Sequence, residues 1–485
     1  MEGEEKPLVM ERKTLEIEES VMMEKDGGLQ KGCMNESKKL WEIAGPVILA
    51  SVSEFSISFI TAAFVGHLGE LEFAAVSVSQ NVIEGFVYGI MLGMGSALET
   101  LSGQAVGAGR FEMLGIYLQR SFVVTCTTAL CLTPVYIYAS PLLQLIRQDK
   151  RISELAGQYS LWVIPQLFAY AINFPIQKFL QSQSRVWVMT MISVATLLLH
   201  VLLTWIFVAK LNHGIVGAAM AGNISWWLMV SAMSYYVVSG CFPAAWNGFS
   251  LMAFRSLCSF VKLSLASAVM FCLELWYYTA VILMVGWLKN PEIAVDAISI
   301  CMNLQLWFVM IALGFNAAIS VRVSNELGAG HPKATKFAIV VAIITSTTMG
   351  SLFTVAIVAT KNQFPKMFTD KAAVIRETSK LGFFLAATIF LNSIQPVLYG
   401  VAVGAGWQVL VALINVSCYY IFGLPVSALL GYKFNYGVYG IWSGLLLGCF
   451  MQTLFLSCLI ARTKWQKEAL LAEARMKTWG SKPNE

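Results

Sequence analysis

The chain has 485 residues, of which 57% are hydrophobic and 13% are charged, with a formal net charge of +5. Soluble domains carry about 25% charged residues, so this composition excludes an ordinary soluble protein and indicates a polytopic membrane protein. The net charge bears on membrane orientation and gives no support for nucleic-acid binding. The ten cysteines form no C-x-x-C pair, which argues against a zinc site or a disulfide framework.

The first 40 residues contain no apolar run, so we expect residues 1–40 to form a disordered cytosolic tail. Apolar runs then recur along the chain, each long enough to cross about 30 Å of hydrocarbon as a helix. The expected spans are 41–66, 73–98, 114–139, 155–180, 186–209, 215–240, 258–287, 294–319, 335–359, 379–403, 407–431 and 437–461. The predicted fold class is therefore an all-α membrane protein with twelve transmembrane helices.

These spans divide into two six-helix bundles, residues 41–240 and 258–461, joined by a linker at 241–257. Residues 462–485 form a second cytosolic tail. Its sequence TKWQKEALLAEARMKTWG has helical spacing and predicts either a helix on the membrane surface or a solvated helix. An even number of spans puts both tails on one side of the membrane. The short loops do not decide the orientation, but the Lys and Arg residues of the tails place both termini in the cytosol.

The two bundles are related by an internal repeat. The segment GMGSALETLSGQAVGAGR at 93–110 aligns with GFNAAISVRVSNELGAGH at 314–331, an offset of 221 residues, and the same offset carries Pro175 onto Pro396. Near the end of each unit, NHGIVGAA matches NYGVYGIW. Three matches in the same order indicate duplication of a six-span unit. Because six is even, both copies enter the membrane in the same sense, and the pseudo-two-fold axis runs along the membrane normal.

Four motifs together identify a family. GSALETLSGQAVGAG, CLELWYY, SNELGAGHPKAT and LNSIQPVLYGVAVGAGWQ resemble the plant branch of the MATE (multidrug and toxic compound extrusion) transporters, and the similarity covers about residues 38–465. The branch that the chain is most similar to includes transporters of flavonoid glycosides and other secondary metabolites. The resemblance implies an antiporter that exports such organic solutes or xenobiotics from the cytosol in exchange for protons.

One motif places a carboxylate inside the seventh span. Glu274 lies about 20 Å along this helix from a start near residues 254–261, too deep for its side chain to reach the cytosolic surface. An ionised carboxylate in hydrocarbon costs at least about 2.5 kcal/mol, so such acids face a bundle interior or a wet cavity. Burial disfavours the charged form, which makes Glu274 a candidate proton carrier. A purely structural hydrogen bond is the alternative. In the family, the matching glutamate is implicated in proton coupling.

Other acids depart from the family pattern. Bacterial relatives often carry an acid in the first span at the position of Thr61, whereas here Glu54 lies seven residues earlier on the same helix face. Glu54 is a second proton-coupling candidate, with a buried structural hydrogen bond as the alternative, and Glu84 is a weaker one. Some relatives have an aspartate in span ten, where this chain has Asn392. Because an amide cannot titrate, Glu274 would carry the proton of its bundle largely alone. The missing acid also disfavours a sodium site.

Polar and aromatic side chains in spans seven, eight, ten and eleven are candidates for substrate binding, with interhelical hydrogen bonding as the alternative for each. They are Tyr277, Tyr278, Asn303, Gln305, Trp307, Asn392, Gln395, Asn415 and Tyr419. Pro396 and Pro175 lie in the fourth span of each unit, and we expect them to act as hinges or static kinks. His200 is interpreted as a packing residue.

The sequence contains no Ser/His/Asp cluster, no P-loop and no metal-ligand spacing, so we expect no enzyme activity and no cofactor. An anion channel or anion transporter in the same fold is the alternative function, and a membrane enzyme would need a cluster of His, Asp or Cys at one face. The expected partners are a small organic solute, protons and the lipid bilayer, and we expect a monomer. The vacuolar membrane and the plasma membrane both remain open as its location.

Overall fold

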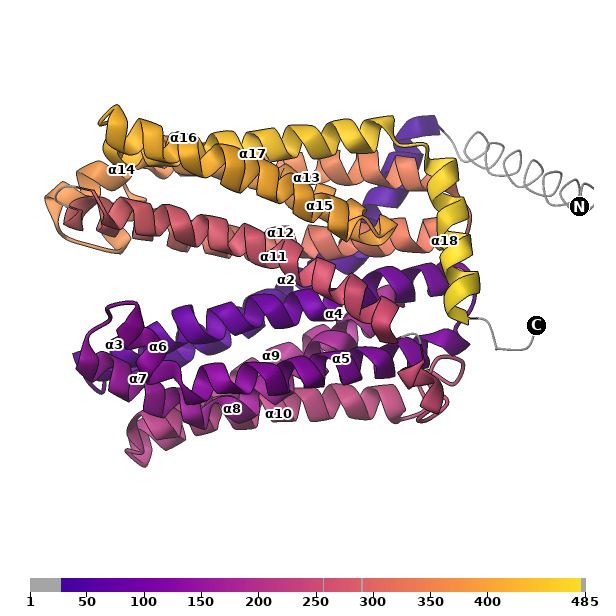
Figure 1. Ribbon diagram of the computed structural model, residues 1–485, viewed down its shortest axis with the longest axis horizontal. Coiled ribbons are helices and arrows are strands. Elements are labelled where there is room, and N and C mark those ends of the chain that lie inside the picture. Colours follow the sequence, from indigo (N-terminus) through magenta and orange to yellow (C-terminus); the bar gives the residue numbers. More distant parts are fainter. Residues whose placement is uncertain (1–27, 256, 289–290, 481–485) are drawn as a thin grey trace, which may run out of the picture.

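In the computed structural model, which describes residues 28–255, 257–288 and 291–480, every regular element is helical. The helices form two bundles (Figure 1). The amino-terminal bundle contains α2 (Gly28–Gly66), α3 (Glu70–Val78), the π-helical segment η1 (Ser79–Glu84), α4 (Gly85–Gly107), α5 (Glu112–Ile137), α6 (Ala139–Leu145), α7 (Lys150–Trp162), α8 (Ile164–Ser182), α9 (Val186–Thr204), the π-helical segment η2 (Trp205–Lys210) and α10 (Gly214–Val238).

A linker with one 3-10 turn, η3 (Leu251–Phe254), leads into the second bundle. The carboxy-terminal bundle contains α11 (Leu257–Gly286), α12 (Glu292–Gly328), α13 (Pro332–Thr360), the 3-10 turn η4 (Phe364–Met367), α14 (Ala372–Ala405), α15 (Gln408–Asn415), the π-helical segment η5 (Val416–Gly423), α16 (Leu424–Ala428), the π-helical segment η6 (Leu429–Lys433) and α17 (Gly437–Arg462). A last helix, α18 (Trp465–Gly480), follows. The all-α fold of two helical bundles is as the sequence predicted.

Eleven helices in the described ranges are long and apolar enough to cross a membrane, and the expected fourth span, 155–180, is not among them. The chain breaks at Val163, which lies between α7 and α8. Pro165 at the start of α8 lacks the N–H that a continuing helix needs, but it is well suited to a first helical turn. The resulting α8 is short and carries several buried amides. These polar side chains are tolerated because α4, α5 and α10 cover the helix.

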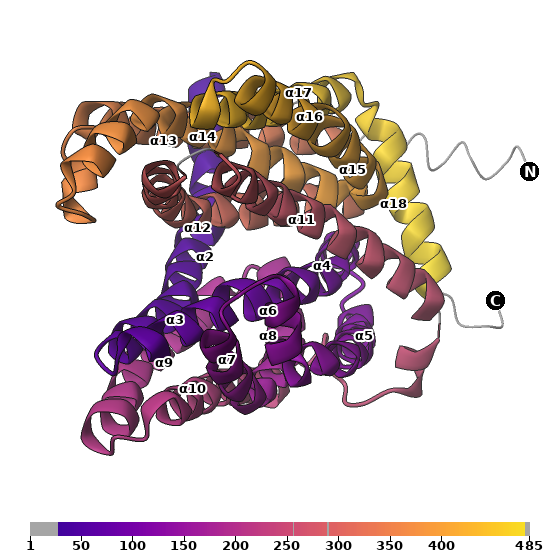
Figure 2. The same ribbon diagram turned by 60° about the vertical axis from the view of Figure 1, so that its left-hand side comes forward.

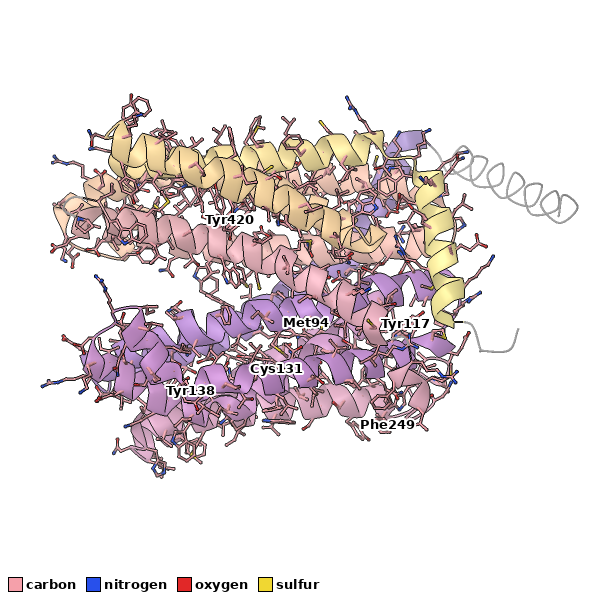
Figure 3. The ribbon with its side chains drawn as sticks, in the orientation of Figure 1. Met94, Tyr117, Cys131, Tyr138, Phe249 and Tyr420 are labelled. Carbon is pink, nitrogen blue, oxygen red and sulfur yellow. The ribbon has the colours of Figure 1, made fainter. Side chains whose placement is uncertain are left out.

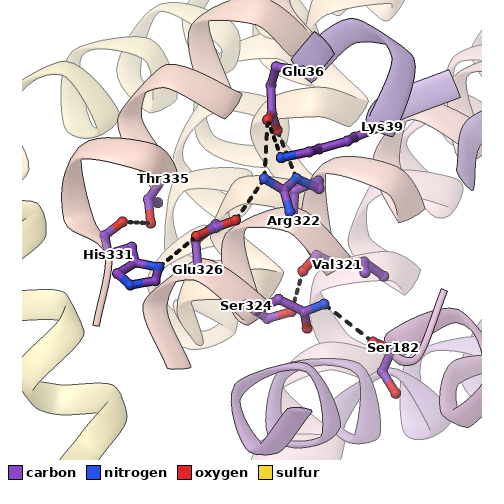
Figure 4. Close-up of polar contacts among 10 residues, drawn as sticks. Glu36, Lys39, Ser182, Val321, Arg322, Ser324, Glu326, His331 and Thr335 are labelled. Atoms are coloured by element: carbon purple, nitrogen blue, oxygen red, sulfur yellow. Dashed lines mark hydrogen bonds and ion pairs between the residues drawn. The ribbon is translucent and has the colours of Figure 1, made fainter. Parts of the chain in front are cut away.

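Residues 28–40 are helical, whereas the sequence assigned them to a disordered tail; residues 1–27 lie outside the described residues. Glu36 of α2 is buried and accepts hydrogen bonds from Nε (2.7 Å) and Nη2 (3.2 Å) of Arg322 on α12. Arg322 also pairs with Glu326 at 2.7 Å, and Glu326 lies 3.2 Å from His331 (Figure 4). A long-range ion pair thus orders a segment that contains no apolar run.

The two bundles meet closely where the repeated Gly-rich segments end. A Cβ atom at Gly107 would collide with the backbone carbonyl of Asn325, and one at Gly328 would collide with that of Gln104. The offset of 221 residues carries Gly107 onto Gly328 and Gln104 onto Asn325, so exchanging the halves exchanges these contacts. Reciprocal contacts of this kind are the mark of a two-fold axis, which here passes between α4 and α12.

Backbone geometry repeats as well. Gly109 and Gly330, in the matching Gly-Ala-Gly turns, have φ values of +70° and +77°. In the second matched motif, Asn212 and Asn435 have φ values of +52° and +57°. These conformations favour Gly and Asn, which explains why the two copies share these residues.

Hydrogen bonds and α18 hold this end of the molecule together. Thr100 of α4 donates to the carbonyl of Val403 (2.5 Å), and Gln104 donates to that of Gly404 (3.1 Å). Helix α18 lies across both bundles, since Arg110 donates to the carbonyl of Met476 and Trp407 donates to Glu468. The ribbons converge at the α18 end and diverge toward the opposite end (Figure 1). We call the convergent end the tail end.

The linker is attached at the tail end too. Gln119 of α5 donates to the carbonyl of Gly248 and accepts from the backbone N–H of Ser250. Phe249 in this linker and Tyr138 at the far end of α5 lie near opposite ends of the long axis (Figure 3). The linker therefore fastens the first bundle to the start of α11 on the same side as α18.

We expect Gly107→Ala to destabilise the folded protein by about 1–3 kcal/mol, because the added methyl group meets backbone atoms of α12 that cannot rotate away. Thermal unfolding of the purified protein in detergent micelles measures this change. Gly286→Ala is the matched control, since nothing lies within 4 Å of a Cβ atom there. Equal stability of the two variants would show that α4 and α12 are not in close contact at this point.

Candidate functional site

Glu274 lies on α11 and is half-buried. Its carboxylate accepts a hydrogen bond from Nε2 of Gln395 on α14 (2.9 Å), and the hydroxyl of Tyr399 is a second polar neighbour. Both partners are neutral. No ion pair to Glu274 occurs within the described residues.

A polar network extends from Glu274 into the carboxy-terminal bundle. The amide of Gln395 also donates to the Tyr419 hydroxyl, and Asn415 donates to the Tyr399 hydroxyl at 2.6 Å. The ring of Tyr419 is stacked on that of Tyr277, with centroids 4.4 Å apart. Tyr419 belongs to η5, and π-helical segments of this kind are frequent at functional sites because they change the direction of side chains within a helix.

Tyr278 makes a second branch of this network. Its hydroxyl donates to Oδ1 of Asn392 at 3.1 Å and lies 3.6 Å from the sulfur of Cys449 on α17. The next residue of η5 after Tyr419, Tyr420, lies within the same bundle (Figure 3) and donates to the backbone carbonyl of Leu273. Helices α11, α14, α15 with η5, and α17 thus converge around Glu274.

The candidates on span eight lie elsewhere. Asn303 is exposed, and its amide donates only to the Ser299 carbonyl of its own helix. Gln305 is buried outside this network. Trp307 packs edge-on against Phe55, with ring centroids 5.1 Å apart, so it contacts the other bundle. The side chains of span eight therefore do not join the network around Glu274, whereas Cys449 of α17, the twelfth expected span, does. That spans seven, eight, ten and eleven line the solute cavity stays a prediction.

Sequence analysis missed three members of the network, Tyr399, Cys449 and Gln452. Gln452 of α17 donates to Oδ1 of Asn415 at 3.5 Å. Tyr399 lies four residues after Gln395 on the same helix face, so its spacing was a usable signal. Gln452 is a single amide in an apolar span, which is the same signal that marks Gln395 and Asn415.

The amino-terminal bundle holds its own buried acids. Glu54 accepts hydrogen bonds from Gln177 (2.6 Å) and Ser193 (3.2 Å). Glu84 accepts only a long bond from Gln166 (3.4 Å), and its second oxygen has no hydrogen-bond partner.

Thr61, which stands where bacterial relatives often carry an acid, lies 3.0 Å from Nε2 of His200. Ser225 completes the polar contacts on the other side of the ring. His200 is thus a buried, hydrogen-bonded histidine, as the packing interpretation expected.

A further acid, Glu99 in the repeated Gly-rich motif, was also missed. It is 2% exposed and pairs at 2.7 Å with Lys178 of α8, whose side chain is 12% exposed. This buried ion pair ties α4 to α8. Its surroundings differ from those of Glu274, because Glu99 contacts a side chain of opposite charge, whereas Glu274 accepts from a neutral amide.

The two candidate hinges lie inside continuous helices, Pro175 in α8 and Pro396 in α14. The carbonyl of Pro396 accepts from the amide of Asn316 on α12 at 2.8 Å. Whether either proline acts as a hinge remains a prediction. No group of three or more metal-ligating side chains occurs in the part of the chain that the structure describes.

Two related helical bundles with buried acids and amides inside the spans define a polytopic membrane transporter. A family model described as MatE matches residues 46–206 and 266–429. The chain is 54% identical over 450 residues to Protein DETOXIFICATION 33 of Arabidopsis thaliana, covering 93% of each chain. It is 52% identical over 459 residues to Protein DETOXIFICATION 29 of the same plant, covering 95% of this chain and 92% of that one.

Solved structures agree. The crystal structure of the eukaryotic MATE transporter AtDTX14 matches with a TM-score of 0.87 and 32% identity, covering 92% of this chain and 99% of that one. The Vibrio cholerae MATE transporter VcmN in the bent form matches with a TM-score of 0.77 at 18% identity, covering 91% and 99%, which is a likeness of fold. The chain belongs to the MatE family and is an integral membrane transporter, as the sequence motifs predicted.

Because Glu99 and Glu274 have different partners, replacing each acid should change the stability of the fold by a different amount. Glu99→Gln should destabilise the fold by about 3–5 kcal/mol, because it leaves the Lys178 ammonium buried without its counter-charge. Glu274→Gln should stay within about 1 kcal/mol of the natural protein, since a glutamine oxygen still accepts from Gln395.

Unfolding in detergent at neutral pH measures both changes. The double variant Glu99→Leu with Lys178→Met is the control and should recover most of the loss, because it removes both charges together. A Glu274→Gln protein as unstable as Glu99→Gln would contradict the assignment of neutral partners to Glu274.

Proposed function

We propose that this transporter exports amphipathic organic solutes from the cytosol in exchange for protons, and that Glu274 carries the proton in the carboxy-terminal bundle. The observation that supports this role is the partner set of the carboxylate. Glu274 accepts a hydrogen bond from the Gln395 amide and has no ion pair among the described residues, so gaining a proton breaks no ion pair. An acid of this kind can change its charge inside the membrane, and burial makes the protonated form accessible.

The neighbours of Glu274 support coupling to movement of the bundles. Trp276 stacks on Phe86 at the start of α4, with centroids 5.7 Å apart and planes at 6°. Leu275 approaches Gly89 of the same helix so closely that a Cβ atom there would clash. The residues that follow Glu274 therefore touch the other bundle, and repacking of α11 on protonation would change this contact.

Proton and solute would then act on the same two conformations. Protonated Glu274 lacks the charge that makes burial costly, so the bundle can close around it; ionised Glu274 favours a wetter arrangement that accommodates a polar or cationic solute. Each ligand shifts the equilibrium toward the state that it binds better. In alternating access by rocking, the hydrogen bonds of Thr100 and Gln104 at the tail end must break when the cytosolic side opens.

Aromatic pairs between the bundles support an amphipathic, ring-containing solute. Phe86 with Trp276 and Phe55 with Trp307 bring rings from both halves together. Such rings offer flat apolar contact, and buried tyrosine hydroxyls add hydrogen bonds. Flavonoid glycosides, other secondary metabolites and xenobiotics have this combination of flat rings and polar groups. We further propose that Tyr278, Asn392 and Gln395 contact the solute. A monomer in the vacuolar or plasma membrane is sufficient for this function.

Proton coupling is tested by Glu274→Gln in liposomes containing the purified protein. This change keeps the size and hydrogen bonding of the side chain but removes the titratable group. Uptake driven by an imposed pH gradient, measured against a panel of plant metabolites, should fall at least tenfold at all gradients, while insertion and stability stay unchanged.

Glu54→Gln is the matched control in the other bundle and should reduce uptake less. Normal transport by Glu274→Gln across the full range of gradients would contradict the proposal and move the coupling acid to the amino-terminal bundle. Anion currents that need no pH gradient would instead favour the channel alternative.

A further inference from the structure

A shallow basic cavity, open to the surface, lies on the carboxy-terminal bundle at the end opposite α18. It has a volume of about 450 Å³ and is formed where α13 ends and α14 begins. This part of the bundle is at the periphery of the molecule (Figure 2). The cavity is lined by Lys361, Asn362, Lys366, Ile375, Arg376, Ser379, Lys380 and Phe383.

The lining contains four cationic side chains and no carboxylate. Only Lys380 has an anionic partner, Glu377 at 3.5 Å, and Glu377 also accepts a hydrogen bond from Tyr439. Within the described residues, Lys361, Lys366 and Arg376 form no ion pair. Of the other charges in this segment, Lys371 pairs with Asp296 at 3.9 Å, and Asp370 forms no ion pair within the described residues. The cavity therefore has an excess of positive charge that the protein itself does not neutralise.

Membrane topology does not explain these cations. Lys and Arg gather in the cytosolic parts of membrane proteins, and here the two ends of the described chain, the start of α2 and α18, lie at the opposite end of the molecule (Figure 1). Four basic residues around one cavity on the other face run against this tendency. A ligand that carries negative charge would account for these four basic side chains.

An apolar surface runs from the cavity toward the middle of the membrane. The Lys361 ammonium lies 3.8 Å above the ring of Phe383, which is 53% exposed. On α13, which packs against α14, Leu352 and Val355 are 62% and 67% exposed. Cations at the helix ends above exposed apolar side chains match the two parts of a phospholipid, its phosphate and its acyl chains.

We propose that this cavity binds the phosphate headgroup of an anionic phospholipid in the leaflet away from the termini. Arg376 offers a planar pair of N–H donors to phosphate oxygens, and the three lysines surround it with point charges. The acyl chains lie against Phe383 and the exposed face of α13. A free phosphate ion would use the same cations but would gain nothing from this apolar surface, which favours the lipid.

Native mass spectrometry of the full-length protein, purified in detergent and supplied with phosphatidylglycerol or phosphatidylcholine, tests the proposal. The natural protein should retain phosphatidylglycerol in preference to phosphatidylcholine. The combined variant Lys361→Gln, Lys366→Gln, Arg376→Gln and Lys380→Gln should bind phosphatidylglycerol more than tenfold less tightly, since each charge near a membrane surface contributes about fivefold. If this variant does not fold, the exposed pair Lys366→Gln with Arg376→Gln replaces it.

The matched control removes four basic residues from the same face, as Lys150→Gln, Arg151→Gln, Lys210→Gln and Lys433→Gln, and should bind the lipid as the natural protein does. Equal loss in the control, or retention of the lipid by the cavity variant, would overturn the proposal. Displacement of phosphatidylglycerol by millimolar inorganic phosphate would also overturn it, because the site would then be one for free anions.

Discussion

A polar side chain surrounded by hydrocarbon must find its partner within the protein, and this requirement organises the molecule. No water in the bilayer core can satisfy a carboxylate or an amide, so each such group draws another helix toward it. Gln395 brings α14 to Glu274, Gln177 brings α8 to Glu54, and Lys178 brings α8 to Glu99. The nature of the partner then separates two kinds of buried acid. A lysine supplies the opposite charge, as for Glu99, whereas an amide supplies only a hydrogen bond, as for Glu274.

The two duplicated halves provide different partners for their buried polar side chains. Both bundles share the Gly-rich segments that meet at the two-fold axis, because only glycine permits the backbones of α4 and α12 to approach so closely. Away from the axis the copies diverge. Glu99 corresponds by position to Ser320, so the buried ion pair exists only in the first half. In the second half, η5 carries Tyr419 onto Tyr277 beside Glu274 and Gln395. In the first half, Gln166 donates to both Glu84 and the Tyr170 hydroxyl, without such a stacked tyrosine pair at the acid among the described residues.

Much of this organisation can be predicted from the sequence. Helical length, apolar runs and the repeat predict two bundles, and the lone acid in CLELWYY predicts the place of the site. What the sequence could not give is the rotation of each helix about its own axis. Asn303 and Asn415 look equivalent in apolar spans, yet one is exposed and the other is buried beside Tyr399. Long-range ion pairs are also not visible in the sequence. Glu36, in the helix of residues 28–40, pairs with Arg322, which is almost 300 positions away.

The central claim is that proton uptake by Glu274 moves the bundles relative to each other. Spin labels at the exposed positions Glu112 and Lys333 would report on the distance across the tail end, after replacement of the exposed native cysteines. In the natural sequence, lowering the pH should shift this distance distribution toward longer values, as the protonated bundle closes at its other end and the tail end opens. In Glu274→Gln, the distribution should not respond to pH. An equal response to pH in both proteins would contradict the account.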